Sequence, residues 1–519
     1  MDNLFTPNSI PSFDYDRDLC SPGQPPYTRG IYSDMYKGKE FTMRQLTGFG
    51  SPSDTNKRIK YMLSNGATGL SILFDFPTIE MYDSDDHFSK GHIGTAGVCI
   101  DSIEDMHILF DGIDITKHSI SLVTHYPTNT AILFSMFLSM ASERSIPWNL
   151  LRGSVQNDLV MEEVIRCGLN FIPPSNCFRI QCDNIEFITN NLPLWNPATF
   201  NGYNLREAGT SIITESAVAL SNAIWTTLEL QRRGYEPSQI LKRLSFFFSA
   251  GSNFFEEIAR LRALRRLWYK YTKEFFDIEP SKSSLLRCHV QTSGISLTRQ
   301  EPLNNIIRAA YQALASVFGG TQSLHVDSYD EAYSTPSEEA ALISLRTQQI
   351  IQNETEITKV VDPLGGSYYL EYLTNKLEQE IHDKVRTITI ESNGFITYIE
   401  SKTIQDEINT FTYNRQKSID NGEVTIVGLN KYTTNNQPII PFIVPETVEQ
   451  DQIERLTILK SKRDNKKVAK ALTNLSSACR TPNINILPYC IVCAKLRCTE
   501  GEMATAINSS FNSWNKYNG

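Results

Sequence analysis

The sequence has little of what marks several classes of protein. Only 10 of its 519 residues are cysteine, which is too dilute for a disulfide-held scaffold. The 49 Lys and Arg residues are outnumbered by 58 Asp and Glu residues, so the net charge is −9. This argues against a nucleic-acid-binding protein, which normally carries a basic stripe. The longest apolar tract, residues 131–141, is too short to span a bilayer and predicts a buried helix.

The N-terminal residues MDNLFTPNSI contain neither a basic region nor a continuous apolar run, so no secretory signal is predicted. We therefore expect a cytoplasmic protein with no membrane partner and no nucleic-acid partner. A cluster of cysteines near the C-terminus suggests zinc, but residues 488–503 have a helical pattern in which the thiols are better explained as small apolar fillers. No metal site is predicted. The four cysteines are Cys479, Cys490, Cys493 and Cys498.

A β-then-α alternation begins near residue 69 and repeats along the chain. Strands separated by helix-length segments indicate right-handed βαβ units, and eight of them indicate a (β/α)8 TIM barrel, an α/β fold; spacing alone also allows an open doubly wound sheet. The strand candidates are Gly69–Phe74, Ser119–Val123, Arg152–Val155, Thr199–Tyr203, Arg243–Phe248, Leu285–Val290, Ser323–Val326 and Lys359–Val361. The helix candidates include Ile103–Phe110, Thr128–Arg144, Glu207–Arg232, Asn253–Tyr271, Leu303–Phe318 and Glu338–Gln352.

Three parts are expected. Residues 1–50 are rich in Pro, Gly and Tyr and predict an N-terminal arm. Residues 51–400 form the barrel, and residues 401–519 form a C-terminal helical extension.

The segments after the strand candidates are polar and glycine-rich, as the ligand-facing rim of a barrel requires. Several strands also carry serines where most barrels have Val, Ile or Leu. These serines indicate either an axis left open for a slender polar guest or hydroxyls bonded to the backbone, and the pattern favours neither. The serines are Ser71, Ser119, Ser121, Ser154 and Ser245.

A series of motifs from about residue 27 to residue 506 resembles the substrate-binding large subunit of methylmalonyl-CoA mutase and related acyl-CoA mutases. The motifs include YSDMYKGKEFTMRQLTGFGSPSDTN (32–56), VQNDL (155–159), HVQTSGISLT (289–298), GGTQSLH (319–325), DPLGGSYY (362–369) and VGLNKY (427–432).

The resemblance implies a (β/α)8 barrel threaded by the pantetheine arm of coenzyme A and capped by adenosylcobalamin. In that family a radical from the cofactor abstracts hydrogen from the acyl group, and a neighbouring group migrates. The protein must close the site to water and position the acyl carbons.

The resemblance also assigns residues to the acyl-CoA. Lys39 stands where the family has arginine, so the charge is kept and the bidentate fork is lost. Gln156 and Gln291 match amides near the acyl part. The other matched CoA positions are Tyr32, Met35, Thr42, Arg44, Ser71, Ser121, Ser154, Arg243 and Ser245.

Four positions are assigned to catalysis: Gln156, Arg166, Leu46 and Asn204. Arg166 matches a clamp for a substrate carboxylate, which would imply a dicarboxylic thioester. Leu46 replaces an active-site tyrosine, and Asn204 replaces a histidine that bonds the thioester oxygen. Asparagine still donates an N–H but cannot become an imidazolium.

The expected cobalamin face is partly changed. Ile79 and Ile295 replace a histidine and a tryptophan, and Asp327 replaces an asparagine. The positions assigned to this face are Phe74, Ala96, Glu207, Gly294, Ile295, Glu331 and Ala332.

The cobalamin-binding domain of the family carries Asp-x-His-x-x-Gly, and the nearest match, Asp105-Met106-His107, lacks the glycine and falls in a predicted helix. We therefore expect adenosylcobalamin to arrive with a small cobalamin-binding subunit, and a homodimer is left open. His125, after the second predicted strand, has no counterpart in the family; the sequence favours a structural role for it, with an added acid–base group as the alternative.

The leading hypothesis is the acyl-CoA-binding large subunit of an adenosylcobalamin-dependent carbon-skeleton mutase, an intramolecular transferase. One alternative is a cobalamin-independent decarboxylase or lyase that acts on an acyl-CoA or an acyl-carrier-protein thioester. The other is a catalytically silent subunit that binds CoA.

Overall fold

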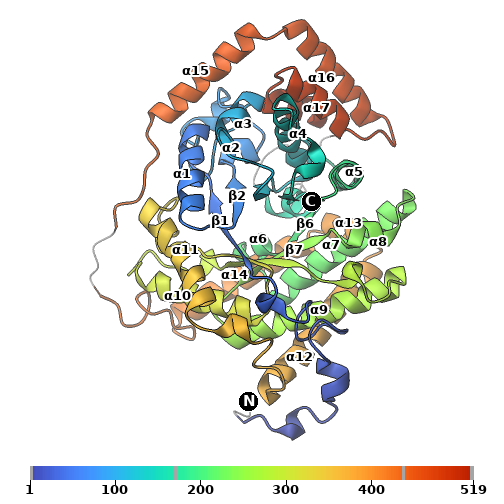
Figure 1. The fold of residues 1–519 in the computed structure, drawn as a ribbon, viewed down its shortest axis with the longest axis vertical. Helices are drawn as coiled ribbons and strands as arrows, with labels where there is room; N and C mark the ends of the chain where they lie inside the picture. Colours follow the sequence, from blue (N-terminus) through green and yellow to red (C-terminus); the bar gives the residue numbers. More distant parts are fainter. Residues whose placement is uncertain (1–3, 167–171, 435–438, 513, 515–519) are drawn as a thin grey trace. The chain divides into compact units, whose positions relative to one another are not determined.

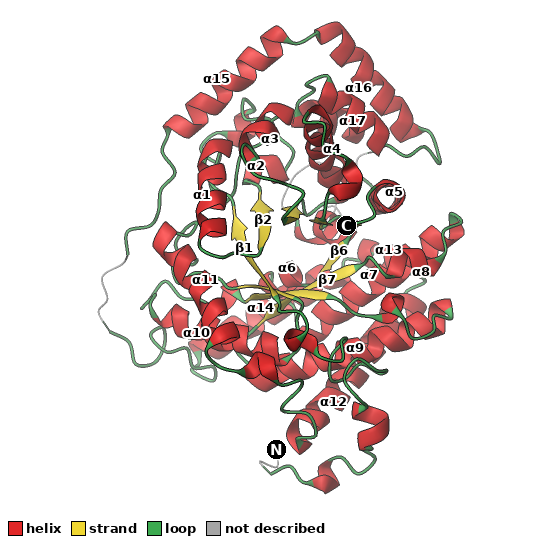
Figure 2. Cartoon of the chain, viewed as in Figure 1, coloured by secondary structure: helices red, strands yellow, loops and turns green. Residues whose placement is uncertain are grey.

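The computed structural model describes residues 4–166, 172–434, 439–512 and 514. Its strands form one parallel sheet of nine strands in the order β5-β4-β3-β2-β1-β9-β8-β7-β6. Figure 2 distinguishes strands, helices and loops by colour. Helices follow the strands along the chain, so the fold is of the predicted (β/α)8 barrel class. The strands are β1 Thr42–Thr47, β2 Gly69–Leu73, β3 Ser119–Val123, β4 Gly153–Val155, β5 Trp195–Asn196, β6 Thr199–Asn201, β7 Ser245–Ala250, β8 Cys288–Thr292 and β9 Ser323–His325.

The helices range from single turns to long rods (Figure 1). They are α1 Pro52–Ser64, α2 Phe76–Ile79, α3 Ile103–Leu109, α4 Pro127–Glu143, α5 Pro174–Asn191, α6 Tyr203–Glu207, α7 Ile212–Arg232, α8 Pro237–Leu241, α9 Phe254–Phe276, α10 Asn304–Phe318, α11 Glu338–Asn353, α12 Tyr368–Arg386, α13 Phe395–Glu400, α14 Thr403–Asp420, α15 Thr447–Lys462, α16 Asn465–Arg480, α17 Leu487–Lys495 and α18 Glu500–Asn508. Among the described residues, none of these helices has the length and apolar character needed to cross a membrane.

One predicted strand is wrong. Lys359–Val361 is not a strand: Ile357–Lys359 forms a 3-10 helix, and Val360 is 55% exposed. Two observed strands were missed. One is the two-residue β5, and the other is β1, which lies inside the predicted N-terminal arm. Its buried side includes Gln45 and Thr47, and these polar residues hid the alternation that marks a half-buried strand.

The predicted helix Glu207–Arg232 is two helices. Gly209 has a φ of 107°, a left-handed conformation that favours glycine and stops α6. Ser211 then caps α7, its hydroxyl accepting a hydrogen bond from the Thr214 N–H at 3.1 Å. The break leaves Thr210 and Ser211 at the start of a long helix.

The chain divides into two compact units, one of residues 1–43 with 200–441 and the other of residues 44–199 with 442–519. The boundaries of these units differ from the domain boundaries predicted at residues 50 and 400. The three predicted parts stay a prediction. In the first unit, helix α9 binds the N-terminal segment. Its residue Arg265 donates hydrogen bonds to the carbonyls of Tyr27 and Thr28, both at 2.8 Å. In the same helix Arg262 is buried and pairs with Asp362 and Glu371.

In the second unit the apolar tract 131–141 forms the middle of α4, which is buried on all sides as predicted. Helix α17 packs on α4 and covers it (Figure 1). Cys490 and Cys493 on α17 are fully buried, as apolar fillers should be. His107 lies in α3 beside Glu143 at 3.0 Å, a helix residue as the sequence predicted.

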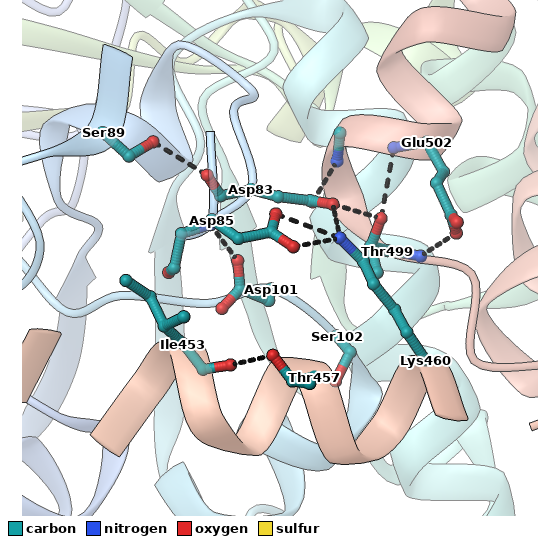
Figure 3. Close-up of polar contacts among 12 residues, drawn as sticks. Asp83, Asp85, Ser89, Asp101, Ser102, Ile453, Thr457, Lys460, Thr499 and Glu502 are labelled. Carbon is teal, nitrogen blue, oxygen red and sulfur yellow. Dashed lines mark hydrogen bonds and ion pairs between the residues drawn. The ribbon is translucent and has the colours of Figure 1, made fainter. Parts of the chain in front are cut away.

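The C-terminal segment of this unit is joined to the loop after α2 by one buried carboxylate (Figure 3). Asp83 accepts hydrogen bonds from the Thr499 hydroxyl and the Gly501 N–H, both at 2.7 Å. Lys460 lies 3.1 Å from Asp83 and 2.7 Å from Asp85. Burial raises the pKa of Asp83, because these contacts only partly replace its hydration.

We expect Thr499→Val to lower the free energy of unfolding by about 2–3 kcal/mol, because it removes the N-cap of α18 and one partner of a buried carboxylate. Thr457→Val is the matched control, since that exposed hydroxyl only bonds the Ile453 carbonyl within α15 (Figure 3). Denaturant unfolding of both variants measures the effect. Equal stability of the two would contradict the anchoring role of Thr499.

Candidate functional site

A row of four predicted site residues crosses neighbouring strands in the second unit. The parallel register pairs Leu46 of β1 with Ser71 of β2, Ser71 with Ser121 of β3, and Ser121 with Ser154 of β4. Because side chains alternate along a strand, in-register residues share one face of the sheet. The Ser154 hydroxyl donates to the Ser121 hydroxyl at 3.1 Å. The serines therefore form a line of hydroxyls rather than isolated backbone contacts.

Arg44 stands two residues before Leu46 on the same face of β1. Its guanidinium donates to the Leu70 carbonyl at 2.6 Å and to the Ser119 hydroxyl at 2.8 Å. Burial lowers the pKa of Arg44 to about 10, so the side chain keeps its charge at neutral pH. Arg44 is therefore a fixed cation on the side of the hydroxyl row that faces the amino-terminal ends of the strands. The resemblance places the CoA head on this side.

The first unit carries a second polar group at the carboxyl ends of β7, β8 and β9. The register places Ser249, Gln291 and His325 side by side. Gln291 donates through Nε2 to the Tyr203 hydroxyl at 2.8 Å and to Asp327 Oδ1 at 2.7 Å. The Tyr203 ring stacks on Phe247 with centroids 4.8 Å apart. Gln291 is thus held by two partners that fix its amide plane.

Two acceptor atoms of this group lack partners. Gln291 Oε1 and Asp327 Oδ2 are buried, and neither has a hydrogen bond among the described residues. An unsatisfied buried acceptor costs free energy, so a native site that keeps two of them is built for a hydrogen-bond donor that is not part of the chain. The space beside them is kept open by Gly294, because a Cβ there would lie 3.1 Å from Glu207 Oε2.

Glu207 ends α6 and closes this group. Its Oε1 accepts from the Ser293 hydroxyl at 2.9 Å and from the Ser249 hydroxyl at 3.3 Å, and its Oε2 accepts from the Ile295 N–H at 2.6 Å. These bonds join α6 to the ends of β7 and β8, and they set the turn that presents Ile295. The Ile295 side chain itself is 43% exposed.

The carboxyls of this group are poised near neutrality. Burial raises the pKa of Glu207 to about 7 and that of Asp327 to about 7. Burial and the Asp327 charge raise the pKa of Glu331 to about 8. Burial lowers the pKa of His325 to about 4, although its Nε2 lies 3.2 Å from Asp327 Oδ1. The site therefore holds a neutral imidazole and acids that share few negative charges at pH 7.

Asn204, in α6, faces its neighbour Asn201. The Asn201 Nδ2 donates to Asn204 Oδ1 at 2.9 Å, and the Asn204 backbone N–H donates to Asn201 Oδ1 at 3.0 Å. With its oxygen occupied, the amide turns its NH2 group away from Asn201. The resemblance expects this NH2 group to donate to a thioester oxygen.

Arg166 is placed differently from a free carboxylate clamp. Its side chain is 2% exposed, its Nε lies 2.8 Å from Glu80 Oε2, and its Nη1 lies 3.6 Å from Glu162 Oε1. The guanidinium also lies 5.3 Å from the centre of the Tyr126 ring. Two internal carboxylates therefore already balance its charge.

His125 follows β3 in the second unit and has an unusual backbone. Its φ is 51°, and the flanking residues close a tight turn in which the Tyr126 N–H donates to the Thr124 carbonyl at 2.6 Å. The imidazole is buried, and its Nδ1 has no hydrogen bond among the described residues. Burial lowers the pKa of His125 to about 4, so the ring is neutral at pH 7.

The functional roles of the remaining predicted residues stay predictions. Two of these residues lie in other elements than expected: Thr42 is on β1 rather than in an arm, and Arg243 precedes β7 rather than lying on it. Arg243 and Gln156 are buried, whereas Tyr32 is 36% exposed and Lys39 is exposed. Phe74 pairs with Val98 in an isolated bridge, next to Ala96, which has a φ of 57°. The others are Met35, buried as the first residue of a 3-10 helix, Thr42 opposite Ser323, Ser245 at the start of β7, and Ala332 in the turn after β9.

Tyr203 was not assigned a role from the sequence, although it touches Gln291. The signal was present: Tyr203 directly precedes Asn204 in the polar segment after β6. What the sequence lacked was the stacking on Phe247, 44 residues further along the chain, which aims the hydroxyl.

With this geometry in view, comparison with known proteins identifies the family. The family model described as methylmalonyl-CoA mutase matches residues 1–513. The chain belongs to the methylmalonyl-CoA mutase family. The chain is 37% identical over 488 residues to the "2-hydroxyisobutanoyl-CoA mutase large subunit" of Aquincola tertiaricarbonis. The matched region covers 94% of this chain and 86% of that protein.

Two methylmalonyl-CoA mutases are similarly close. The Rhizobium meliloti enzyme is 38% identical over 496 residues, covering 94% of this chain and 68% of its own length. The human mitochondrial enzyme is 38% identical over 494 residues, covering 94% of this chain and 65% of its own length. The predicted family and the predicted class, an intramolecular transferase of the CoA mutase type, are confirmed.

We expect Asp327→Asn to change how stability depends on pH. The pKa of Asp327 is about 7 when folded and near 4 when unfolded. The folded state therefore holds the proton more tightly, and its stability falls as pH rises from about 4 to about 7. Asparagine removes this loss, so the variant should be more stable than the parent at pH 8, by up to about 4 kcal/mol, and gain little at pH 4.5.

Thermal unfolding at the two pH values measures this. Asp420→Asn is the control, an exposed carboxyl at the end of α14. A gain for Asp327→Asn that is the same at both pH values would show that Asp327 does not titrate in this window.

Proposed function

We propose that this chain is the acyl-CoA-binding large subunit of an adenosylcobalamin-dependent carbon-skeleton mutase that works with a separate cobalamin-binding subunit. The observation that carries the proposal is the in-register row of Leu46, Ser71, Ser121 and Ser154 in a chain of this family. A pantetheine arm is slender and has amide groups, and a line of hydroxyls beside it supplies hydrogen bonds without filling the space. Arg44 adds a cation suited to the phosphates of CoA.

The acyl end of the substrate would meet the amides. Gln291 is held rigidly by Tyr203 and Asp327, and Asn204 presents its NH2 group because Asn201 occupies its oxygen. An N–H directed at a thioester oxygen stabilises the charge that develops there as the acyl group reacts. Asparagine supplies this bond at every pH, whereas a histidine would supply it in a protonation-dependent way.

The residues of the first unit fit adenosylcobalamin. Its adenosyl group carries ribose hydroxyls, which are donors of the kind that the buried Gln291 Oε1 and Asp327 Oδ2 lack. Ile295, at the turn fixed by Glu207, offers exposed apolar surface to a flat macrocycle. When bound, the cofactor supplies an organic radical by homolysis of its Co–C bond. The chain's own contribution is to exclude water, hold the acyl carbons and keep the surrounding carboxyls partly protonated at neutral pH.

The substrate acyl group that the geometry favours has no free carboxylate. A substrate carboxylate at Arg166 would have to displace Glu80 or bury a third negative charge beside Glu80 and Glu162. We therefore place Arg166 as a positioning residue that braces Tyr126 and the loop after β2. Leu46, in line with the hydroxyl row, leaves an apolar surface where the resemblance expects a tyrosine.

The test mixes the chain with a cobalamin-binding subunit, adenosylcobalamin and a set of carboxylated and uncarboxylated acyl-CoAs, and follows isomerised products by chromatography. Isomerisation of an uncarboxylated acyl-CoA that needs the corrinoid supports the proposal. Turnover without any corrinoid would instead establish the decarboxylase or lyase alternative. Tight acyl-CoA binding with no product under any condition would establish the silent subunit.

We expect Ser121→Leu to weaken CoA binding at least about tenfold, because the larger side chain enters the space that the hydroxyl row borders. Calorimetry measures affinity, and thermal unfolding measures stability. If the row borders open space, affinity falls while stability is kept. A large loss of stability would show instead that Ser121 lies in close-packed interior. Ile120→Leu on the opposite face of β3 is the control for affinity.

A further inference from the structure

The first unit contains a cavity of about 480 Å³ that neither the hydroxyl row nor the catalytic residues explain. It lies at the amino-terminal ends of α7 and α9, and residues of α14 form part of its wall. Its far side reaches Ser293 and Ile295, at the edge of the proposed cobalamin face. The polar lining residues used in the argument are Arg206, Thr210, Ser211, Asn253, Glu256 and Arg415.

Two long helices direct their amino-terminal ends at this cavity. Helix α7 has 21 residues and α9 has 23, and the first turn of each contributes to the lining. The first N–H groups of a helix have no partner within the helix, and the helix dipole places partial positive charge there. Ser211 satisfies only the Thr214 N–H, so the N–H groups of Ile212 and Ile213 remain for a ligand. Such a place favours an anion.

Thr210 provides a second and independent observation. It is 1% exposed, and its hydroxyl has no hydrogen-bond partner among the described residues. Its backbone is fixed, because its N–H donates to the Leu205 carbonyl at 3.0 Å and its carbonyl accepts from Arg206 Nη1 at 3.2 Å. A buried hydroxyl in a cavity wall with no internal partner is available to donate a hydrogen bond to a bound ligand.

Arg415 provides a third. Its guanidinium has no hydrogen bond or ion pair with any residue in the described part of the chain, although it is half-buried in the cavity wall. Burial and the charge of Arg206 lower the pKa of Arg415, since like charges converge. Arg206 is already balanced by Glu215 at 3.6 Å and Glu257 at 3.5 Å, whereas Arg415 forms no ion pair with the described residues.

The acids at the cavity have other partners. Glu256 accepts from Asn253 Nδ2 at 3.1 Å, and Glu380 lies 3.8 Å from Lys376. Glu207 also attracts Arg415, but its oxygens are occupied by Ser249, Ser293 and the Ile295 N–H. The unsatisfied groups at the cavity are therefore donors and a positive charge.

We propose that this cavity binds a phosphate group, held by Arg415, the Thr210 hydroxyl and the first N–H groups of α7. Phosphate suits the site better than a single carboxylate because its oxygens can accept from all three kinds of donor at once. The site lies outside the hydroxyl row and does not depend on the proposed mutase activity.

The test uses the full chain and inorganic phosphate, with binding followed by isothermal calorimetry at low ionic strength. The parent protein should bind phosphate at one saturable site, and Arg415→Ala should weaken it at least about tenfold, the loss of a charge-assisted contact. Lys417→Ala is the control, because Lys417 is an exposed cation on the same helix. It should change the affinity less than about twofold, since solvent screens its charge.

Thr210→Val separates binding from folding. Because the hydroxyl has no internal partner, valine should leave the unfolding temperature unchanged while phosphate binding weakens about three- to tenfold. Absence of saturable phosphate binding in the parent, or equal binding in the Arg415 and Lys417 variants, would overturn the proposal. Acetate that binds as tightly as phosphate would overturn the assignment of the ligand as a phosphate.

Discussion

The parallel register of the strands is the constraint on which the candidate site depends. Side chains alternate along a strand, so a register that pairs Ser71 with Ser121 and Ser121 with Ser154 places three hydroxyls on one face. A shift of one residue would exchange them for Leu70, Ile120 and Gly153. The outward neighbours Leu70 and Ile120 are almost fully buried, and their packing resists such a shift. The apolar side of the sheet therefore positions the polar side.

Buried charge is handled in two different ways in this chain. Arg166 and Arg262 are each matched by two carboxylates, so their charges are balanced within the chain. Glu207 at the end of α6 and Asp327 after β9 have no Lys or Arg ion pair among the described residues, and burial instead raises the pKa of each to about 7. The ion pairs hold parts of the chain together, whereas the acids with pKa values near 7 lie where a ligand is expected.

This contrast bears on substrate choice. A guanidinium whose charge is already balanced gains little from a further carboxylate, because the new contact must replace an existing one. Arg415 is the opposite case, a cation with no counter-ion in the described part of the chain, beside helix ends that favour anions. Of these two cations, Arg415 rather than the residue that the family resemblance would select is the one available to an anion.

Much of the fold was predictable because the periodicity of short runs of residues indicates it. The strands β2 and β3, the buried helix α4 and the family motifs all follow from short runs whose periodicity or spacing is specific. Leu46, Ser71, Ser121 and Ser154 were found in this way, and the register brings them into one row. β1 was missed because Gln45 and Thr47 are buried polar residues, which local hydrophobic patterning does not anticipate.

The sequence by itself determined the class of fold, the family and the line of hydroxyls, since each is carried by residues close together in the chain. Only the tertiary structure decided which groups lack partners. Whether Arg166 is balanced, whether Thr210 and Arg415 face a cavity, and whether Asp83 meets Thr499, 416 residues away, depend on contacts between distant segments. The type of a side chain determines which hydrogen bonds or ion pairs it is able to form, but packing determines which partners lie within reach. The groups left without a partner are the ones that a ligand can bind.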